Sequence, residues 1–426
     1  MRYLYLNKII KILNIMTENF ITEIFVEKSR NIKKFKIPIS DFTRQHLIIT
    51  GKNGSGKTSL LLEINKFLSK ISQGSLINLE SYKKRLEKLK IDQNKEGISD
   101  ADRIQTKKNI ELYQNEINSY GSVELKFSGS ESIISEKSEI GTFILAYFDS
   151  KRHTQLNVPQ GINKIVLNKK YNLKEKANVN FIQYIVNLKA DRSFAKDDND
   201  LETTRNIDNW FEKLEHRFRS IFDNESLTLK FNRKTYNFDI LLDDKELFTF
   251  NTLSDGYSAI ISIVTEILLR MEAHNTKSYD LEGVVIIDEI ETHLHVDLQK
   301  KILPFLTDFF PKIQFIITTH SPFVLSSLSN ATICDLESKI ITTDLSGYSY
   351  DALIESYFKS DKYSEELKGK ISVFEELLKI ENPNQEQVTE IRKMKDYLSS
   401  LPKYLSKELH SKLLDIEINY LTKIKF

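Results

Sequence analysis

Eight residues near the N-terminus combine glycines, a lysine and a threonine at a spacing suited to binding phosphate. The run GKNGSGKT, from Gly51 to Thr58, fits the pattern G-x-x-x-x-G-K-[ST] at every fixed position and follows the apolar stretch Leu47–Ile49. Glycines let the backbone curl so that its N–H groups point at an anion, and the N-terminus of a following helix adds positive charge. The sequence therefore predicts a nucleoside triphosphate site. The alternative is a glycine-rich turn without a ligand.

The chemistry of the side chains in this run indicates how a nucleotide would be held. Lys57 can reach the β- and γ-phosphates, and the Thr58 hydroxyl can ligate Mg²⁺. We therefore expect a nucleotide and Mg²⁺ as ligands. The expected phosphate-binding residues are consecutive: Gly51, Lys52, Asn53, Gly54, Ser55, Gly56, Lys57, Thr58 and Ser59.

Two further apolar runs end in residues that could act on water. Val284–Ile287 is followed by Asp288, which could hold Mg²⁺, and by Glu289, which could polarise an attacking water as a general base. His320 follows another strand-like run, and ligands gather at the C-terminal ends of parallel strands. This histidine could contact the γ-phosphate. The alternatives are solvated acids at a strand end and a capping or core histidine.

The elements that must position these residues follow from the hydrophobic pattern. Strand-like and helix-like runs alternate over residues 283–328, which is typical of a parallel α/β domain. Two short strands are expected within 21–39, and alternating segments between 227 and 250 predict antiparallel strands. We therefore expect an α/β fold with a mixed sheet.

Helical insertions and one basic stretch interrupt this pattern. Segment 79–120 carries apolar residues at 3-4-3 spacing on both sides of Asn94–Gly97, which predicts a short antiparallel hairpin. Whether the hairpin binds a partner or is a plain surface pair stays open. A second helical region spans 179–222 and contains Trp210. Segment 151–176 is irregular, and its basic residues are Lys151, Arg152, Lys164, Lys169, Lys170, Lys174 and Lys176.

Composition limits the class of protein. The 426 residues hold 61 Lys and Arg against 60 Asp and Glu, so no overall positive charge favours nucleic acid binding. Cys334 is the only cysteine, which excludes an intrachain disulfide and a zinc site built on thiolates, and fits a reducing cytoplasm. No run approaches the ~18 apolar residues of a membrane span. We expect a soluble cytoplasmic protein.

The N-terminus could be misread as a targeting signal. Residues 1–15 are apolar and basic, but they lack a small-residue cleavage site and are interrupted by Lys8 and Lys11. Met16 is a candidate for the natural start, which would leave residues 1–15 as an extension.

The order of the motifs resembles that of the ATP-binding-cassette ATPases. Between the phosphate loop and the carboxylates lies Leu253–Ser258, LSDGYS, which is similar to the family signature LSGGQ but departs from it at Asp255 and Tyr257. In that superfamily the signature of one subunit closes over the γ-phosphate bound by the other. The resemblance implies ATP as the nucleotide, a head-to-tail dimer, and contacts to the nucleotide from Ser254, Asp255 and Gly256. An ordinary helix N-cap at Ser254 is the alternative.

The C-terminal half resembles a narrower group. Its blocks DEIETHLHV and TTHSP are similar to the RecF, overcoming-lysogenisation-defect and structural-maintenance-of-chromosomes heads. They are closer to the stand-alone AAA family ATPases of bacterial anti-phage systems such as Septu, retron-associated and PARIS systems. Val296 stands where that group usually has proline. The resemblance covers roughly 21–62 and 238–345, and it places His293 and His295 in a dimer-facing loop instead of a metal site.

The tail after Tyr350 is expected to consist of charged helices over 365–380, 385–398 and 404–424. It shows no strand–acid–strand pattern of the Toprim nuclease that the overcoming-lysogenisation-defect family carries. We interpret it as a docking or oligomerisation module. The alternative is a solvated appendage that packs on its own head.

The resemblance implies an ATPase subunit of an anti-phage complex that dimerises around ATP and controls a separate effector protein, such as a nuclease. The alternative is a DNA-binding, repair-type clamp whose segment 151–176 contacts the duplex; a transporter cassette fits less well. Arg30 and Asn31 are candidates for the adenine contact by position only.

These patterns predict six segments along the chain. They are an ATPase lobe with the phosphate loop in 1–73, a helical hairpin insertion in 74–121, a continuation of the lobe in 122–178, a helical insertion in 179–224, the lobe with the signature, carboxylates and histidine in 225–348, and a helical docking module in 349–426.

Overall fold

The chain divides into two compact units, Met1–Tyr348 and Ser349–Phe426. The computed structural model describes residues 18–95, 99–152, 155–242, 247–274, 279–354, 365–380, 383–400, and the single residues 414 and 418. The extension considered at residues 1–15 lies outside the described residues, and so does the tail helix expected over 404–424, apart from those two positions.

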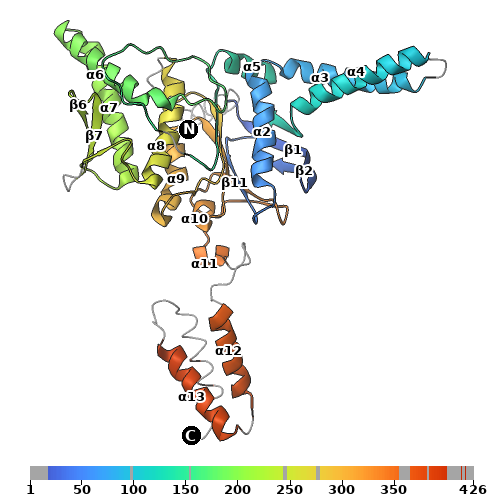
Figure 1. Cartoon of the computed structure of the whole chain (residues 1–426), viewed down its shortest axis with the longest axis vertical. Coiled ribbons are helices and arrows are strands. Elements are labelled where there is room, and N and C mark those ends of the chain that lie inside the picture. The colour runs from blue at the N-terminus through green and yellow to red at the C-terminus, as the bar shows by residue number, and fades with distance from the viewer. Residues whose placement is uncertain are drawn as a thin grey trace, which may run out of the picture. The chain divides into compact units, whose positions relative to one another are not determined.

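A six-stranded sheet forms the centre of the larger unit (Figure 1). Its strands, in spatial order, are β12 (Ile340–Thr343), β11 (Ala331–Asp335), β3 (His46–Thr50), β10 (Ile313–Thr318), β9 (Gly283–Ile287) and β5 (Ile144–Phe148). The strands from β11 to β5 are parallel, and β12 is antiparallel to β11. The predicted α/β fold with a mixed sheet is therefore confirmed.

Uninterrupted apolar runs form the inner strands. Every residue of β3, β9 and β10 is buried, as expected for parallel strands covered on both faces. One face packs against α2 (Lys57–Ser72) and a small sheet, with Leu47 and Ile49 in their shared core. Figure 1 shows α8 (Asp255–Glu272) and α9 (Val296–Phe309) on the opposite side from α2. The small sheet has the order β2 (Ile32–Pro38), β1 (Ile21–Ser29) and β4 (Val123–Phe127).

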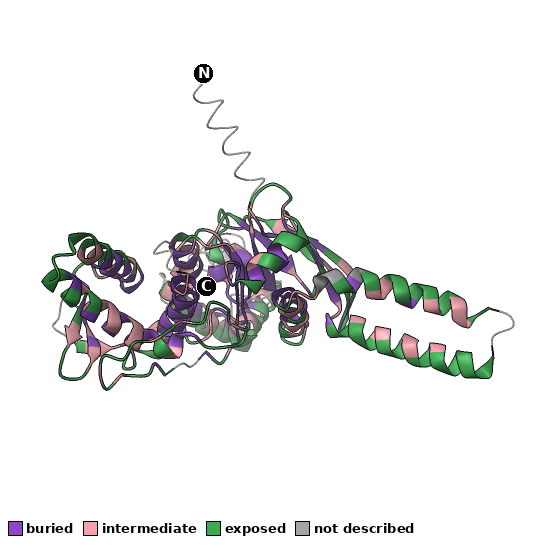
Figure 2. Ribbon diagram, turned by 90° about the horizontal axis from the view of Figure 1, so that it is seen from above, coloured by how far each residue is buried: buried purple, intermediate pink, exposed green. Residues whose placement is uncertain are grey.

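The predicted hairpin consists of α3 (Leu76–Gln93) and α4 (Asp100–Ser119), which run antiparallel and project from the larger unit (Figure 2). The Tyr82 and Tyr113 rings meet across it, 5.8 Å between centroids. At its base, the Tyr120 hydroxyl donates to the Ser75 carbonyl over 2.6 Å. No described residue of α4 is buried, whereas Leu79 and Leu86 of α3 are buried. A short helix that the pattern did not predict, α5 (Glu131–Glu139), follows β4.

The predicted second helical region is present, but the strands after it do not join the central sheet. The elements are η1 (Asn178–Asn180), α6 (Phe181–Asp197), α7 (Leu201–Phe222), β6 (Thr228–Asn232), β7 (Asn237–Leu241) and β8 (Leu247–Thr249). These strands form an antiparallel sheet of their own, in the order β6–β7–β8. The sheet packs on α7, where the Phe211 and Phe238 rings stack with centroids 5.8 Å apart. The boundary expected between segments 179–224 and 225–348 therefore separates α7 from the strands β6 to β8 that pack on it.

Helices alone form the described part of the smaller unit after α11 (Tyr350–Ala352). They are α12 (Glu365–Leu378) and α13 (Gln385–Ser400), which share a core of Ile371, Phe374, Leu378, Ile391 and Leu398. In the larger unit, α10 (Pro322–Leu325) follows β10. Across the described residues of both units, every helix is too short or too polar to cross a bilayer.

Candidate nucleotide-binding site

Three neighbouring parallel strands bring the predicted site residues to one edge of the sheet. β10 pairs with β3 on one side and with β9 on the other. The phosphate loop (residues 51–58) follows β3, the carboxylates follow β9, and His320 follows β10. Because the carboxyl ends of parallel strands lie at the same edge, these groups lie together, with β10 between the phosphate loop and the carboxylates.

The phosphate loop needs its glycines. Gly51 has a φ of 134°, and a Cβ on it would lie 2.9 Å from Ser55 Oγ. Gly56 has a φ of 102° and caps the N-terminus of α2. Within the described residues, the buried Ser55 hydroxyl oxygen has no hydrogen-bond partner. A tight loop with an unpaired hydroxyl at the start of a 16-residue helix fits a phosphate.

Lys57 lies inside this loop. Its Nζ donates to the carbonyl oxygens of Gly51, at 2.8 Å, and Lys52, at 3.1 Å. Burial lowers the pKa of Lys57, and Glu289 is the strongest of the nearby carboxylates that oppose this shift. The other predicted residues lie around it: Lys52, Asn53, Gly54 and Thr58 are exposed, and Ser59 is half-buried on the first turn of α2.

The carboxylates occupy a turn that we call the catalytic turn, Asp288–Ile290. Asp288 is buried, and its Oδ1 accepts from the Thr318 hydroxyl at 2.5 Å. The same hydroxyl oxygen accepts from the Glu289 amide at 2.7 Å. Glu289 is half-buried and has a φ of 46°, a left-handed conformation that is uncommon for residues with a side chain. Thr318 therefore joins the two predicted acids, a role that the sequence did not reveal.

Arg152 also holds this turn. Its guanidinium donates to the carbonyl oxygens of Asp288 at 2.8 Å, Glu289 at 2.8 Å and Ile290 at 3.2 Å. From the sequence, Arg152 is one of the basic residues that could contact DNA. In the structure its side chain is buried beneath the catalytic turn and does not form part of a basic surface.

A third acid supports the histidine. The Glu291 Oε1 atom accepts from the His320 backbone amide at 2.6 Å, while its buried Oε2 atom has no hydrogen-bond partner within the described residues. Burial, and then the positive charge of Lys57, lower the pKa of His320. The lowered pKa favours the neutral form of the His320 imidazole. Glu291 is a further site residue that the sequence pattern did not reveal, although it lies in the block DEIETHLHV.

The signature residues lie elsewhere on the larger unit. Ser254 takes the N-cap position of α8, but its side chain makes no capping hydrogen bond. Gly256 lies so close to the loop after the catalytic turn that a Cβ would be 3.0 Å from the His293 carbonyl oxygen. Ser254, Asp255, Gly256, His293 and His295 line one hollow. None of the described residues that line it belongs to the phosphate loop.

Tyr257, one of the two departures from the family signature, has a packing role. Its ring stacks on Phe222 of α7 with centroids 4.2 Å apart and planes 5° from parallel. The signature thereby contacts the end of α7. His293 and His295 are both exposed, and the nearest acid to His295 is Asp297, 3.5 Å away.

A separate hollow of about 600 Å³ lies beside α2 and could take the nucleoside. Arg30 and Ser59 line it, together with Asn65 and Ser29, whose Oδ1 and Oγ atoms are buried without hydrogen-bond partners within the described residues. Asn31 is exposed at the adjacent turn and does not line it.

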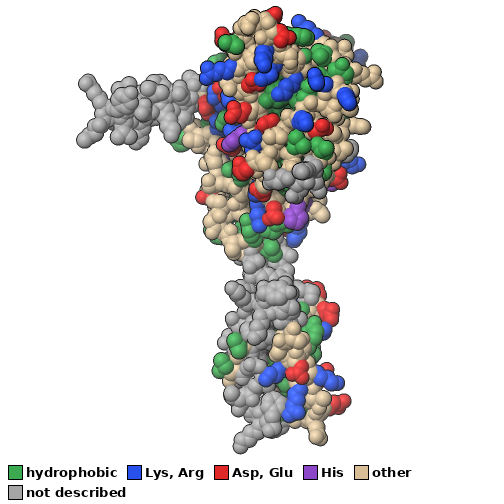
Figure 3. Space-filling model, turned by 90° about the vertical axis from the view of Figure 1, so that its left-hand side faces the viewer, with side chains coloured by type: hydrophobic (Ala, Val, Ile, Leu, Met, Phe, Trp, Pro, Cys, Tyr) green, Lys and Arg blue, Asp and Glu red, His purple; other side chains and the backbone are tan. Residues whose placement is uncertain are grey.

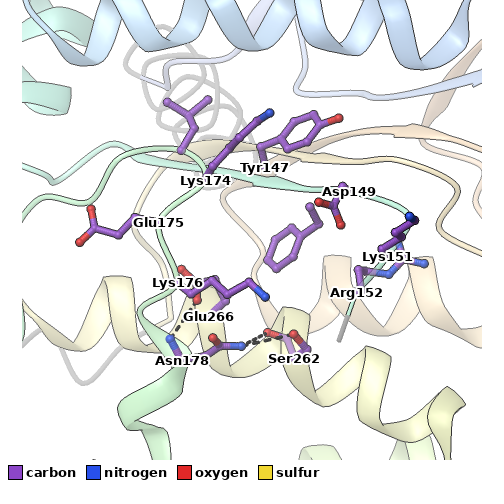
Figure 4. Close-up of a pocket in the computed structure, with 12 residues that line it drawn as sticks. Tyr147, Asp149, Lys151, Arg152, Lys174, Glu175, Lys176, Asn178, Ser262 and Glu266 are labelled. Carbon is purple, nitrogen blue, oxygen red and sulfur yellow. Dashed lines mark hydrogen bonds between the residues drawn. The ribbon is translucent and has the colours of Figure 1, made fainter. Parts of the chain in front are cut away.

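Figure 4 shows the pocket between the end of β5 and α8, and the segment that closes it. Glu266 of α8 accepts from the backbone amides of Ala177 at 3.0 Å and Asn178 at 2.9 Å. Arg270 donates to Glu266 at 2.7 Å and to the Leu145 carbonyl at 2.7 Å. Hydrogen bonds thus join the residues just after the basic segment to Glu266, whose buried ion pair with Arg270 lies within α8.

The residues that could hold Mg²⁺ are Thr58 and Asp288. The described residues include no group of three or more His, Cys, Asp or Glu side chains placed to hold a metal ion. Mg²⁺ in nucleotide sites is usually held by one or two protein groups together with substrate phosphates. An exposed hydroxyl at the start of α2 and a carboxylate at the same sheet edge fit that type of site.

Comparisons with known proteins find a family model, relatives and solved structures that resemble the chain. The family model described as "AAA domain, putative AbiEii toxin, Type IV TA system" matches residues 47–326, more than half of the chain. The Septu protein PtuA of Bacillus mycoides (strain KBAB4) is 35% identical over 160 residues, which are 35% of this chain and 22% of that protein. The Retron Vc95 probable ATPase of Vibrio cholerae serotype O1 biovar El Tor is 30% identical over 167 residues, 36% of this chain and 32% of that protein.

The matched parts cover a third or less of the length of these two relatives. Their names confirm the resemblance to Septu and retron-associated ATPases. Among solved structures, the SMC head bound to the C-winged helix domain of ScpA aligns with a TM-score of 0.35 and 14% identity. That alignment covers 74% of this chain and 94% of the other.

Proposed function

The chain belongs to the AAA-domain family whose model covers residues 47–326, and from this membership we propose that it is an ATPase subunit of a bacterial anti-phage defence system. It would bind ATP with Mg²⁺ and hydrolyse it to ADP and phosphate. The observation that carries the proposal is the arrangement of the phosphate loop, the catalytic turn and His320 at the ends of three adjacent parallel strands.

Each site residue has a role in this reaction. The loop amides and the Lys57 amine would bind the β- and γ-phosphates. Glu289 would accept a proton from water as the water oxygen attacks the γ-phosphorus and the bond to the bridging oxygen breaks. Neutral His320 would hold the water or the γ-phosphate. When bound, Mg²⁺ would be ligated by Thr58 and Asp288 and would neutralise phosphate charge.

We further propose that two copies associate head to tail. Ser254 and Gly256 line a hollow that includes no phosphate-loop residue of the same chain within the described residues, and the Ser254 hydroxyl is not used as a helix cap. A second copy could bring these groups to the γ-phosphate. Asp255 lies in the first turn of α8, where its charge favours the helix but opposes a phosphate. Ser254 and Gly256 are therefore the stronger candidates for the contact.

The elements outside the ATPase core support the proposal that a separate effector protein binds to this chain. The exposed hairpin of α3 and α4 and the helical unit of α12 and α13 are suited to docking a partner. The relatives are named as a Septu protein and a probable retron ATPase, which supports the proposal. We propose that the partner is a separately encoded effector such as a nuclease.

A DNA-binding, repair-type clamp is the competing proposal, and two observations weaken it. Arg152 is buried and is therefore not available to a duplex. On the face shown in Figure 3, acidic and basic side chains are mixed and do not gather by sign. The clamp proposal would require DNA affinity that weakens steeply with added salt.

ATP turnover tests the activity. Wild-type protein should release phosphate from ATP only with Mg²⁺. Glu289→Gln should lower kcat by about 100-fold or more while ATP still binds. Lys57→Ala should lose ATP binding. Equal turnover by wild type and Glu289→Gln would remove Glu289 as the base.

Recovery of partners tests the defence role. Tagged Glu289→Gln, purified from its native host in ATP, should bring down a stoichiometric effector protein identifiable by mass spectrometry, whereas Lys57→Ala should not. Recovery of nucleic acid with no stoichiometric protein would favour the clamp. Cleavage of DNA or RNA by the purified chain alone would contradict a separate effector.

A further inference from the structure

The catalytic turn contains three consecutive carbonyl groups that one side chain satisfies. The Nη1 atom of Arg152 donates to the Asp288 carbonyl, and its Nη2 atom donates to the carbonyls of Glu289 and Ile290. Only 6% of Arg152 is exposed. A guanidinium presents its donors in a rigid plane, which a lysine amine cannot reproduce. This contact fixes the path of the backbone from Asp288 to Ile290.

That backbone has an unfavourable conformation that needs support. Glu289 has a φ of 46°, and a left-handed residue with a side chain costs free energy unless its surroundings hold it. The Thr318 hydroxyl contacts the Glu289 amide on one side of the residue, and Arg152 contacts its carbonyl on the other. The direction of the Glu289 side chain therefore depends on both contacts and on Thr292, whose amide donates to the Glu289 carbonyl at 3.0 Å and whose hydroxyl donates to the Glu289 carboxylate at 3.5 Å.

Arg152 is itself held by its place in the chain. It follows β5 by four residues, and the far end of the same segment is fixed to α8 through Glu266. Burial lowers the pKa of Arg152, and Glu291 is the strongest of the nearby carboxylates that oppose this shift. An arginine side chain stays protonated in proteins, so the guanidinium remains charged under the turn.

We propose that Arg152 is a positioning residue for ATP hydrolysis, which directs the Glu289 carboxylate toward the attacking water by holding the three carbonyls of the catalytic turn. This inference rests on the proposed function, in which Glu289 is the general base. Arg152 touches neither ATP nor water in this scheme. Its removal should therefore affect turnover much more than nucleotide binding.

Turnover and binding separate this role from a merely structural one. Arg152→Ala should lower kcat by about 100-fold, the loss expected from a misplacement of about 1 Å at a reacting group. The Kd for ATP should change by less than about 3-fold, because binding shared by ground and transition states is preserved. Lys164→Ala, in the same segment but exposed, is the matched control and should turn over ATP as the wild type does.

Two further measurements report on the mechanism. Millimolar guanidinium chloride should restore part of the activity of Arg152→Ala by filling the deleted position, whereas methylammonium chloride should not. In a Glu289→Gln background, Arg152→Ala should lower kcat by less than about a further 3-fold, because the effects of residues that act as a unit are not additive. Arg152→Lys keeps the charge and most of the packing, and should recover only part of kcat. Arg152→Lys replaces Arg152→Ala in these measurements if the alanine variant does not fold.

The outcomes are distinguishable. If the wild type does not hydrolyse ATP, the proposed function is wrong. If the wild type turns over and both Arg152 variants match its kcat, only the positioning role is wrong. An equal loss from Arg152→Ala in the wild-type and Glu289→Gln backgrounds would also overturn the role, because Arg152 would then act independently of the base.

Discussion

The Thr318 hydroxyl is shared by two residues with different proposed tasks. It donates to the Asp288 carboxylate, a proposed Mg²⁺ ligand, and accepts from the amide of Glu289, the proposed base. One oxygen atom thus sets the spacing between the metal ligand and the base. Its position at the end of the central strand β10 makes this possible, because β10 lies directly beside β9.

Thr318→Val tests this link with little change in volume. The variant leaves the partly buried Glu289 amide without its acceptor, which should cost about 1–3 kcal/mol of stability. We also expect a lower kcat and a higher Mg²⁺ concentration for half-maximal turnover. Thr318→Ser, which keeps the hydroxyl, is the control. Phosphate release across a Mg²⁺ titration, with urea unfolding, measures both effects, and an unchanged Mg²⁺ requirement would contradict the link.

His46 gives the fold a dependence on pH. Burial, and then the charge of Arg44, lower the pKa of His46 to about 3, and its Nδ1 accepts from the Phe315 amide at 3.1 Å. Between that value and the ordinary pKa of about 6.5, the unfolded chain binds more protons than the folded one. Stability therefore falls as pH falls through this range.

The free energy of unfolding should be lower at pH 5 than at pH 7 by about 2 kcal/mol on account of His46. His46→Gln keeps an acceptor but cannot titrate, so its stability should change less over the same interval. Urea unfolding of both proteins at the two pH values measures the difference. If the free energy of unfolding falls equally in wild type and variant, groups other than His46 cause the pH dependence.

Several site residues could be predicted from sequence because their types and order are distinctive. Arg152 and Glu291 could not. The sequence of a basic segment is the same whether its side chains are solvated or buried. Only the tertiary fold places Arg152 beneath the catalytic turn. Glu291 stands in an acidic block whose members differ only in the direction of their side chains, which the sequence does not specify.

At the scale of elements, α8 connects the signature to the rest of the larger unit. Its first turn carries Ser254 and Gly256 at a hollow, and its buried residues Glu266 and Arg270 hold the segment after β5. Fifteen residues of α8 are buried, so the helix can move only together with its neighbours. A contact made at the signature would therefore reach the segment that carries Arg152.

Ser254→Arg should block association of two copies without changing ATP binding by the monomer, because a bulky cation at the start of α8 fills the hollow. Ser119→Arg, on the exposed end of α4, is the matched control with the same change of charge. Light scattering of Glu289→Gln carrying each substitution, with and without ATP, gives the assembly state. ATP-dependent dimers of the Ser254→Arg protein would contradict a role for the signature in the interface.

Prediction succeeded for elements with a strong pattern. β3, β9 and β10 are uninterrupted apolar runs, and α3 and α4 carry regular apolar spacing. The nine residues of α5 are too few and too polar to stand out from a loop. The grouping of β6 to β8 with α7 depends on ring contacts between distant residues such as Phe211 and Phe238, which no local pattern contains.

For the whole molecule, the division into two units means that each can be tested alone. The apolar cluster around β3 and α2 lies within the larger unit, and the cluster of Ile371 and Phe374 lies within the smaller one. Deleting residues 349–426 should therefore leave a folded protein with the wild-type ATP affinity. Differential scanning calorimetry and ATP titration of this deletion measure both properties. Loss of ATP binding would show that the tail supports the site.

The path of the chain from the phosphate loop to the hairpin has a mechanical consequence. α2 begins at the phosphate loop, and only a few residues separate its end from α3, where the Tyr120 hydroxyl holds the Ser75 carbonyl. A helix rises about 1.5 Å per residue, so α3 makes a lever arm of about 27 Å. If α3 turns with α2, a rotation of about 10° would displace the far end of this arm of about 27 Å by about 5 Å. A small movement of α2 at the phosphates would thus become a larger displacement of the hairpin. A protein bound to the hairpin could respond to this displacement without contacting the nucleotide.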